Sequence, residues 1–221
     1  MKLTIFAATG RIGQHLLDQA VAAGHEVTAV VRQPSKISAP VRVVAADLRA
    51  PDPAALVSAV DGADAVLSGL GPRTKADAGI TSPGTHAIIE AMKAADARRI
   101  IVVSAAPLAP IGVPGGPTPP RFDPGDGFFM RHLFSRLART MFREHYADLA
   151  LMEDELRGSG LDWTVVRPPR LSDGALTGTY RRAYGQNIRG GWIVPRADVA
   201  HLMLALVDQP ESIARTVGVA T

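Results

Sequence analysis

Two closely spaced glycines near the start of the chain, Gly10 and Gly13, constrain the fold more than any other feature. A short apolar run with strand character, residues 3–7, precedes them, and helical spacing begins at Gln14. A buried strand, a glycine turn and a helix form the phosphate-binding start of a doubly wound parallel sheet. Helix N–H groups and the positive dipole end face such a turn, and glycine lets a pyrophosphate approach the backbone. The sequence therefore predicts a dinucleotide site on Thr9, Gly10, Arg11, Ile12 and Gly13.

One position of this turn departs from the dinucleotide pattern, which usually has a glycine where Ala7 or Ala8 stands. Alanine restricts the backbone angles and adds a methyl group. A tight turn without any ligand is the alternative interpretation. The placement of the turn, after a strand and before a helix, favours the nucleotide.

Strands and helices alternate along the first half of the chain. Such alternation implies parallel pairing and right-handed crossovers. It predicts an α/β fold, a Rossmann-like doubly wound parallel sheet in one domain over residues 1–221, with small substrate-side elements near the C-terminus. Asp52 is expected to cap a helix with Pro53 at its first position. Strands are expected at residues 3–8, 26–31, 41–45, 65–68 and 99–104, and helices at 12–23, 53–60 and 82–95.

A proline- and glycine-rich stretch, residues 107–127, interrupts the alternation. It predicts a long loop insertion, either a lid or a tolerated surface loop. Helical spacing returns over residues 128–157, with Arg131, Arg139 and Arg143 on one face, for which a solvated face is favoured over a membrane or partner surface. A strand at 162–167, a loop to about 179, a short strand at 192–194, a helix at 196–207 and an edge strand at 216–220 complete the expected order.

Composition narrows the function classes. The 221 residues include no cysteine, which excludes disulfides, thiolate metal sites and a cysteine nucleophile and suits a reducing cytoplasm. We find no signal peptide and no apolar run of the ~18 residues needed to cross a membrane. The net charge of +3 suits a phosphorylated cofactor, and no nucleic-acid-binding motif accompanies it. The six histidines show no metal-ligand spacing, so no metal site is expected, and the acidic run 153–155 is expected to be a solvated helix face.

Charged residues after the second expected strand indicate which dinucleotide binds. Arg32 lies 22 positions after Gly10, where an acidic residue would bond the ribose hydroxyls of NAD. An arginine there favours the 2′-phosphate of NADP, and Arg11 and Lys36 could join it. The alternative is an arginine that is merely exposed after a strand. We therefore expect NADP(H) as the cofactor.

The carboxyl ends of the other strands should meet at the same crevice. Asp47 and Leu48 are expected at the adenine, where a helix-capping aspartate is the alternative, and Gly69, Leu70 and Gly71 along the ribose. Ser104 would sit beside the nicotinamide and donate to a substrate carbonyl, unless it is an ordinary strand-end serine. Arg170 could bind a substrate carboxylate. Ala105, Pro168 and Leu171 complete the expected nicotinamide end.

The catalytic pair of ordinary short-chain dehydrogenases is missing from its usual place. Those enzymes use a tyrosine with a lysine four residues on, which lowers the tyrosine pKa. Here Ala150 follows Tyr146 at that spacing, Tyr184 follows Tyr180, and no lysine follows Lys93. Interconversion of simple alcohols and ketones is therefore not expected. Conjugated acceptors such as flavins need less proton assistance, because the reduced ring can take its proton from water.

Several stretches together resemble a known family. They are AATGRIG at residues 7–13, VVR at 30–32, ADL at 46–48, LRGSGLDWTVVRP at 156–168 and LTGTY at 176–180. The chain resembles the atypical short-chain dehydrogenase/reductases of the NmrA-like, NAD(P)H-binding branch. Within that branch, PPRLSD at 168–173 followed by LTGTY is similar to the biliverdin-IXβ reductase/flavin reductase group. This resemblance implies NADPH, a single Rossmann-like domain, and hydride transfer to flavins or linear tetrapyrroles.

Two functions remain open at this point. The favoured one is an NADPH-dependent reductase, located in the cytoplasm, that transfers a hydride to a flavin, tetrapyrrole, quinone or similar planar acceptor, with Ser104 and Arg170 orienting it. The alternative is a non-catalytic NADP(H)-binding regulator with a protein partner, as the NmrA-like resemblance implies. Epimerase or isomerase chemistry is a third reading. Neither nucleic acid nor membrane is expected as a partner.

Overall fold

The computed structural model describes residues 1–72, 74, 77–108, 111, 113, 123–125 and 143–221. Its described part is built on one eight-stranded sheet with the strand order β3-β2-β1-β4-β5-β6-β10-β8. All neighbouring strands of this sheet are parallel except β10 and β8, which pair antiparallel. The strands are β1 (Lys2–Phe6), β2 (Glu26–Val31), β3 (Arg42–Ala45), β4 (Ala65–Ser68), β5 (Arg99–Val103), β6 (Asp162–Arg167), β8 (Arg181–Tyr184) and β10 (Arg215–Ala220).

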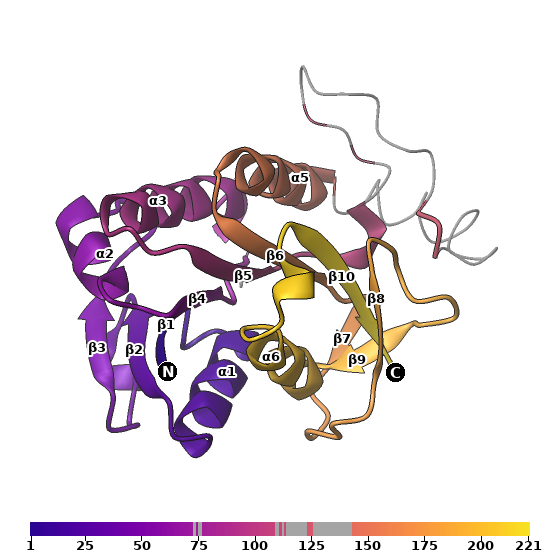
Figure 1. Cartoon of the computed structure of the whole chain (residues 1–221), viewed down its shortest axis with the longest axis horizontal. Coiled ribbons are helices and arrows are strands. Elements are labelled where there is room, and N and C mark those ends of the chain that lie inside the picture. Colours follow the sequence, from indigo (N-terminus) through magenta and orange to yellow (C-terminus); the bar gives the residue numbers. More distant parts are fainter. Residues whose placement is uncertain (73, 75–76, 109–110, 112, 114–122, 126–142) are drawn as a thin grey trace.

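Helices cover both faces of this sheet (Figure 1). On one face, α1 (Arg11–Ala22) lies against α6 (Arg196–Ala205). On the other face, α3 (Thr81–Ala94) lies between α2 (Pro53–Val60) and α5 (Arg143–Gly158). Two short strands, β7 (Arg170–Ser172) and β9 (Ile193–Pro195), form a separate parallel pair. In the described part of the chain, single-turn 3₁₀ helices lie in the connections at Pro34–Lys36, Ala106–Leu108 and Pro210–Ser212.

Alternation along the strands divides the core into two layers. In β5, Ile101 and Val103 pack toward α1 and α6, whereas Ile100 and Val102 pack toward α2, α3 and α5. Because both faces are covered, the strand reads as a continuous apolar run. Strand order reverses between β1 and β4, which are neighbours in the sheet, and this reversal opens a crevice at their carboxyl ends.

The predicted fold class is confirmed, and the element bounds agree closely with the expected ranges. The expected strands at 26–31, 65–68 and 162–167 match β2, β4 and β6 at both ends. Asp52 caps α2 as predicted, with its side chain accepting from the Ala54 N–H at 3.0 Å. Most of the expected loop at 107–127, and residues 128–142 of the expected basic helix, lie outside the described residues.

Two expectations for the C-terminal part are wrong. Residues 170–172 and 181–184 form strands β7 and β8, where a loop to about residue 179 and no further strand were expected. The last strand is not an edge strand, since β10 lies between β6 and β8. Short strands that pair with distant partners are set by tertiary contacts, so local sequence patterns signal them weakly.

Arg99 ties the amino end of the sheet to the C-terminal helix region. It is the first residue of β5 and is buried. Its guanidinium donates to the carbonyls of Asp162, Leu206 and Val207 and to the hydroxyls of Thr164 and Ser212, at 2.7–3.4 Å. Burial lowers the Arg99 pKa, and the charge of Asp162 opposes that shift. This cluster lies at the end of β5 opposite to Ser104.

Candidate cofactor and active site

A cavity of about 730 Å³ runs along the carboxyl ends of the central strands. Its size lies in the range of cofactor and ligand sites. It collects residues from the ends of β1, β2, β3, β4 and β5 and from α5, and therefore occupies the crevice expected for this topology. The lining residues include Thr9, Gly10, Arg11, Ile12, Arg32, Lys36, Asp47, Leu48, Arg49, Gly69, Leu70, Gly71, Asp77, Ser104, His145, Leu149, Leu171 and Arg196.

The glycine turn is held by close backbone packing. A Cβ on Gly13 would come within 2.0 Å of the Ala7 carbonyl oxygen, and a Cβ on Gly10 within 2.9 Å of the same atom. A Cβ on Gly69, at the end of β4, would lie 3.0 Å from the Gly13 nitrogen. Glycine is therefore required at position 13, because only a bare backbone lets α1 start this close to β1.

Ala7 occupies a conformation that glycine ordinarily takes. Its φ is +54°, in the left-handed region, and its carbonyl accepts from the Gly10 N–H at 2.7 Å. A non-glycine residue in this region costs about 1–2 kcal/mol. The departure noted in the sequence is thus a glycine position filled by alanine without loss of the turn.

The N-terminus of α1 carries no capping side chain. Gly10 is its N-cap and makes no side-chain cap hydrogen bond, and the first turn contains no acidic residue. Thr9, Gly10, Arg11 and Ile12 line the cavity at this helix end. Free helix N–H groups that face a cavity are a suitable site for a phosphate, which would supply both acceptor atoms and negative charge.

An arginine pair lies where β2 and β3 end. Arg32 Nη1 lies 3.4 Å from Asp77 Oδ1, and Arg49 Nη2 bonds the same oxygen. Asp77 is buried, and its Oδ2 accepts from the backbone N–H and the hydroxyl of Thr74, at 3.1 and 3.0 Å. Lys36 lines the same cavity. Sequence reasoning found Arg32 and Lys36 but missed Arg49 and Asp77, because neither lies at the spacing of the dinucleotide pattern.

The expected adenine and ribose residues also line the cavity. Asp47 Oδ1 accepts from the Arg49 N–H at 3.1 Å, and Leu48 is buried beside it. Gly69, Leu70 and Gly71 follow β4 along the cavity wall. The structure thus brings these five residues together with the glycine turn, and their contacts to a cofactor stay predictions.

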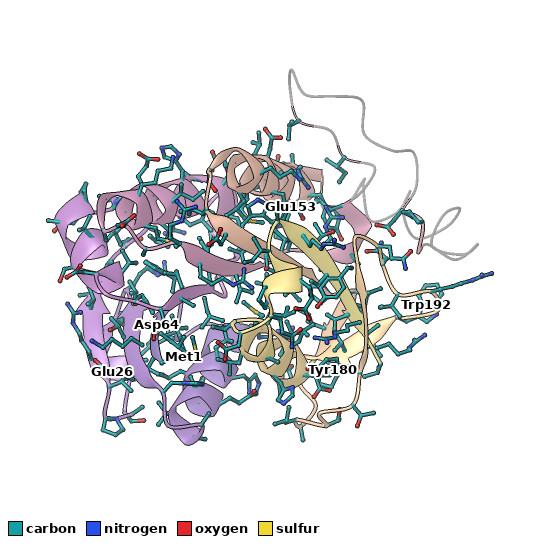
Figure 2. All side chains as sticks on the ribbon, in the orientation of Figure 1. Met1, Glu26, Asp64, Glu153, Tyr180 and Trp192 are labelled. Atoms are coloured by element: carbon teal, nitrogen blue, oxygen red, sulfur yellow. The ribbon has the colours of Figure 1, made fainter. Side chains whose placement is uncertain are left out.

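At the end of β5, Ser104 is joined to a buried ion pair. Its hydroxyl donates to Glu153 Oε1 at 2.7 Å. Glu153 lies on the sheet side of α5 (Figure 2) and also pairs with Arg167, through contacts of 2.9 Å from Nε and 2.5 Å from Nη2. Arg157 adds a contact of 2.7 Å to Glu153 Oε2. Burial alone lowers the Arg167 pKa, but the Glu153 carboxylate reverses the shift, so that the net pKa is raised.

This network changes the role expected of Ser104. A serine hydroxyl has one proton, and here that proton goes to Glu153. Toward the cavity, Ser104 therefore presents lone pairs in this state. The acidic run 153–155 was expected to be a solvated face, which is wrong for Glu153: its side chain is only 1% exposed, because two arginines neutralise it inside the protein.

Two residues of α5 face the cavity beside Ser104. His145 and Leu149 are four residues apart, one helical turn, and both line the cavity. The Tyr–Lys pair of ordinary short-chain dehydrogenases has the same spacing, and the described part of this cavity lining contains no tyrosine. Burial lowers the His145 pKa, Asp148 partly opposes the shift, and the buried Nδ1 has no hydrogen-bond partner among the described residues. Sequence reasoning missed His145, because it examined this spacing only from tyrosines.

Arg170 does not reach the cavity with the residues expected beside it. It is exposed on β7, and its backbone N–H donates to the Trp192 carbonyl at 3.3 Å. The next residue, Leu171, lines the cavity instead, because successive side chains of a strand point to opposite faces. Arg196 also lines the cavity, but it pairs with Asp173 at 2.6 Å. Arg170 therefore has no support as a substrate ligand in this geometry.

Three further predicted residues, Gly13, Ala105 and Pro168, are not among the cavity-lining residues but lie next to them. Gly13 packs its backbone on Ala7. Ala105 precedes the turn at Ala106, whose N–H donates to the Pro168 carbonyl at 2.9 Å. These residues hold the ends of α1, β5 and β6 in place around the cavity. Among the described residues, no cluster of histidines and carboxylates could hold a metal ion.

Comparison with known proteins agrees with this geometry. The family model described as NAD(P)H-binding matches residues 7–210. The chain belongs to the NAD(P)H-binding family. This membership confirms that the protein binds NAD(P)H, and it agrees with the predicted class of NAD(P)H-dependent oxidoreductases. A protein of similar sequence is the uncharacterized protein YwnB of Bacillus subtilis (strain 168), which is 27% identical over 96% of this chain and 94% of its own length.

Solved structures share the fold of this family member over its whole length. SP1627 from Streptococcus pneumoniae TIGR4, for which an NADH-flavin reductase activity is proposed, is 25% identical, with a TM-score of 0.75 over 100% of this chain and 99% of SP1627. The anaerobilin reductase ChuY from Escherichia coli O157:H7 is 23% identical, with a TM-score of 0.76 over 100% and 97%. A short-chain dehydrogenase/reductase from Veillonella parvula DSM 2008, solved with NADP, is 19% identical, with a TM-score of 0.76 over 100% and 94%. In the described part of the chain, no helix is long and apolar enough to span a membrane.

Proposed function

We propose that this protein is an NADPH-dependent reductase that transfers a hydride to a planar conjugated acceptor, such as a flavin, a linear tetrapyrrole or a quinone. One observation carries the proposal: the described part of the cavity lining contains no tyrosine, and its two residues from α5, four positions apart, are His145 and Leu149. Without a tyrosine–lysine pair, an alkoxide-forming reaction has no proton donor of suitable pKa. A conjugated acceptor spreads the incoming charge over its own ring.

The chain's own residues supply binding and orientation. The glycine turn and the α1 N-terminus would hold the pyrophosphate, and Arg32 the 2′-phosphate. Val103, Leu149 and Leu171 offer an apolar wall against which a flat ring can stack. Bound NADPH supplies the hydride, and the protein accelerates transfer by proximity and by exclusion of water.

Two comparisons support the acceptor class. SP1627, at 25% identity, is a proposed NADH-flavin reductase, and ChuY, an anaerobilin reductase, has the same fold. The acceptor of this protein, its contacts with Ser104, and its cytoplasmic location belong to the proposal.

The test is anaerobic NADPH oxidation with FMN, riboflavin, a linear tetrapyrrole and a quinone, each compared with an acceptor-free blank. NADPH carrying deuterium at the transferred C4 position should be oxidised more slowly than unlabelled NADPH, because the C4–D bond breaks in the hydride-transfer step. Transfer to at least one acceptor at a rate well above the blank is the expected result. Tight NADPH binding without transfer to any of them would overturn the proposal and favour the NADP(H)-binding regulator.

A further inference from the structure

Arg32 and Arg49, the arginine pair beside Asp77, bear on the choice between NADP(H) and NAD(H). The spacing of the dinucleotide motif predicted only Arg32. Arg32 and Arg49 come from the ends of different strands, 17 positions apart, yet both bond the same oxygen of one carboxylate. Two guanidinium groups that meet at one point repel each other unless an anion lies between them. Asp77 is that anion in the structure.

Asp77 is itself fixed in place. Its second oxygen accepts two hydrogen bonds from Thr74, and the residue is buried. The two arginine side chains, by contrast, keep 48% and 40% of their surface exposed and line the cavity. A guanidinium has five N–H donors in a planar fork, so one edge can bond a carboxylate while another edge bonds a phosphate.

We propose that Arg49 is a second ligand of the cofactor's 2′-phosphate, acting together with Arg32, and that Asp77 is the positioning residue that holds the two guanidinium groups side by side. The pyrophosphate belongs at the glycine turn, whereas this pair lies at the ends of β2 and β3, where the adenosine ribose is expected. Lys36 adds positive charge to the same wall, so that the surroundings stay net positive even with Asp47 and Asp77 counted. A phosphate gains from this arrangement, and a ribose hydroxyl does not.

The experiment measures dissociation constants of NADPH and NADH by fluorescence, with no acceptor present, so that its outcome does not depend on turnover. Arg49→Ala should weaken NADPH binding about tenfold or more, the usual scale for a charge-assisted hydrogen bond, and leave NADH within about twofold. Arg49→Lys should recover only part of the loss, because an ammonium cannot bond in a fork. Arg42→Ala is the matched control: Arg42 lies on β3, bonds Ser58 at 2.8 Å, and is not part of the cavity lining.

Asp77→Asn tests the positioning role separately. If Asp77 aligns the pair, the variant binds NADPH about three- to tenfold more weakly while NADH is unchanged. Tighter NADPH binding by Asp77→Asn would show that the carboxylate competes with the phosphate, and would overturn that role.

Two other results would overturn the Arg49 assignment. Equal weakening of NADPH and NADH in Arg49→Ala would place this arginine at the pyrophosphate or the adenine. Wild-type protein that does not prefer 2′-AMP over 5′-AMP as a competitor of NADPH would show that no 2′-phosphate site exists at this wall. Thermal denaturation of each variant without ligand checks that the fold is intact.

Discussion

Arg99 and Arg167 are both buried arginines at the ends of neighbouring strands, yet they have opposite surroundings. Arg99 begins β5 and bonds only neutral carbonyls and hydroxyls. Arg167 ends β6 and bonds the carboxylate of Glu153. Burial lowers the pKa of Arg99, whereas the ion pair reverses that effect and raises the pKa of Arg167.

The difference separates a structural end of the sheet from a functional end. The carbonyls and hydroxyls that accept from Arg99 join β5, β6 and the C-terminal region, and this cluster is not part of the cavity lining. The Arg167–Glu153 pair instead reaches the cavity through the Ser104 hydroxyl. Parallel sheets bind ligands at their carboxyl ends, so the same residue type stabilises the fold at one end and prepares the site at the other.

The largest effect is expected at the structural end. Arg99→Met leaves three carbonyls and two hydroxyls without their donor, and should lower the free energy of unfolding by about 4 kcal/mol. Urea denaturation measures the loss. Arg98→Met, at the exposed neighbouring position, should cost less than about 1 kcal/mol. The NADPH affinity of the folded fraction should be unchanged. A large change in that affinity would contradict the separation of the sheet into a structural and a functional end.

Glu153→Gln should be costly in both stability and turnover. It leaves the buried charge of Arg167 without its carboxylate, which costs about 3 kcal/mol. Combining it with Arg167→Met should regain part of that stability without restoring turnover, because Ser104 still lacks its charged partner. Asp154→Asn, at the adjacent exposed position of α5, is the control. Recovery of turnover in the double variant would show that Glu153 acts only through stability.

Ser104→Ala should separate stability from turnover most clearly. The free energy of unfolding should change by less than about 1.5 kcal/mol, the scale of one hydrogen bond, while turnover at saturating NADPH falls about tenfold. Ser68→Ala is matched, since Ser68 ends β4, is buried, and does not line the cavity. Equal turnover of the Ser104→Ala and Ser68→Ala variants would show that Ser104 does not contribute to catalysis.

The smallest effect concerns pH. Burial lowers the His145 pKa, so the folded protein favours the neutral imidazole. The resulting stability is present above the unfolded pKa of about 6.5 and is lost as the pH falls through the folded value. Between pH 7.5 and 5.5, the free energy of unfolding of wild type should therefore fall more than that of His145→Gln, as measured by urea denaturation at each pH. Arg99 stays charged over this range and therefore adds no pH dependence at the opposite end of the sheet.

Local patterns in the sequence were sufficient for most of the fold. The glycine turn, the Asp52 cap and the apolar strand runs all act within a few residues, and each predicted its element closely. The wall residues Arg32, Asp47 and Ser104 could be found because strand ends converge in this topology.

The residues that sequence reasoning missed depend on contacts between distant segments. Glu153 is buried only because Arg167 and Arg157 meet it, and Arg49 matters only because Asp77 links it to Arg32. Arg170 is not among the cavity-lining residues for a simpler reason: on β7 it is the neighbouring Leu171 that faces the cavity. One residue of register decides which side chain faces inward.

The uncapped start of α1 has a consequence for the lifetime of the protein. A helix end that lacks a side-chain cap is completed by whatever anion occupies the turn, so the cofactor becomes part of the folded framework. Ligand at a hundred times its dissociation constant adds about 2.7 kcal/mol to stability. Resistance to proteolysis should therefore rise and fall with the supply of the dinucleotide, and the abundance of the protein would follow that supply.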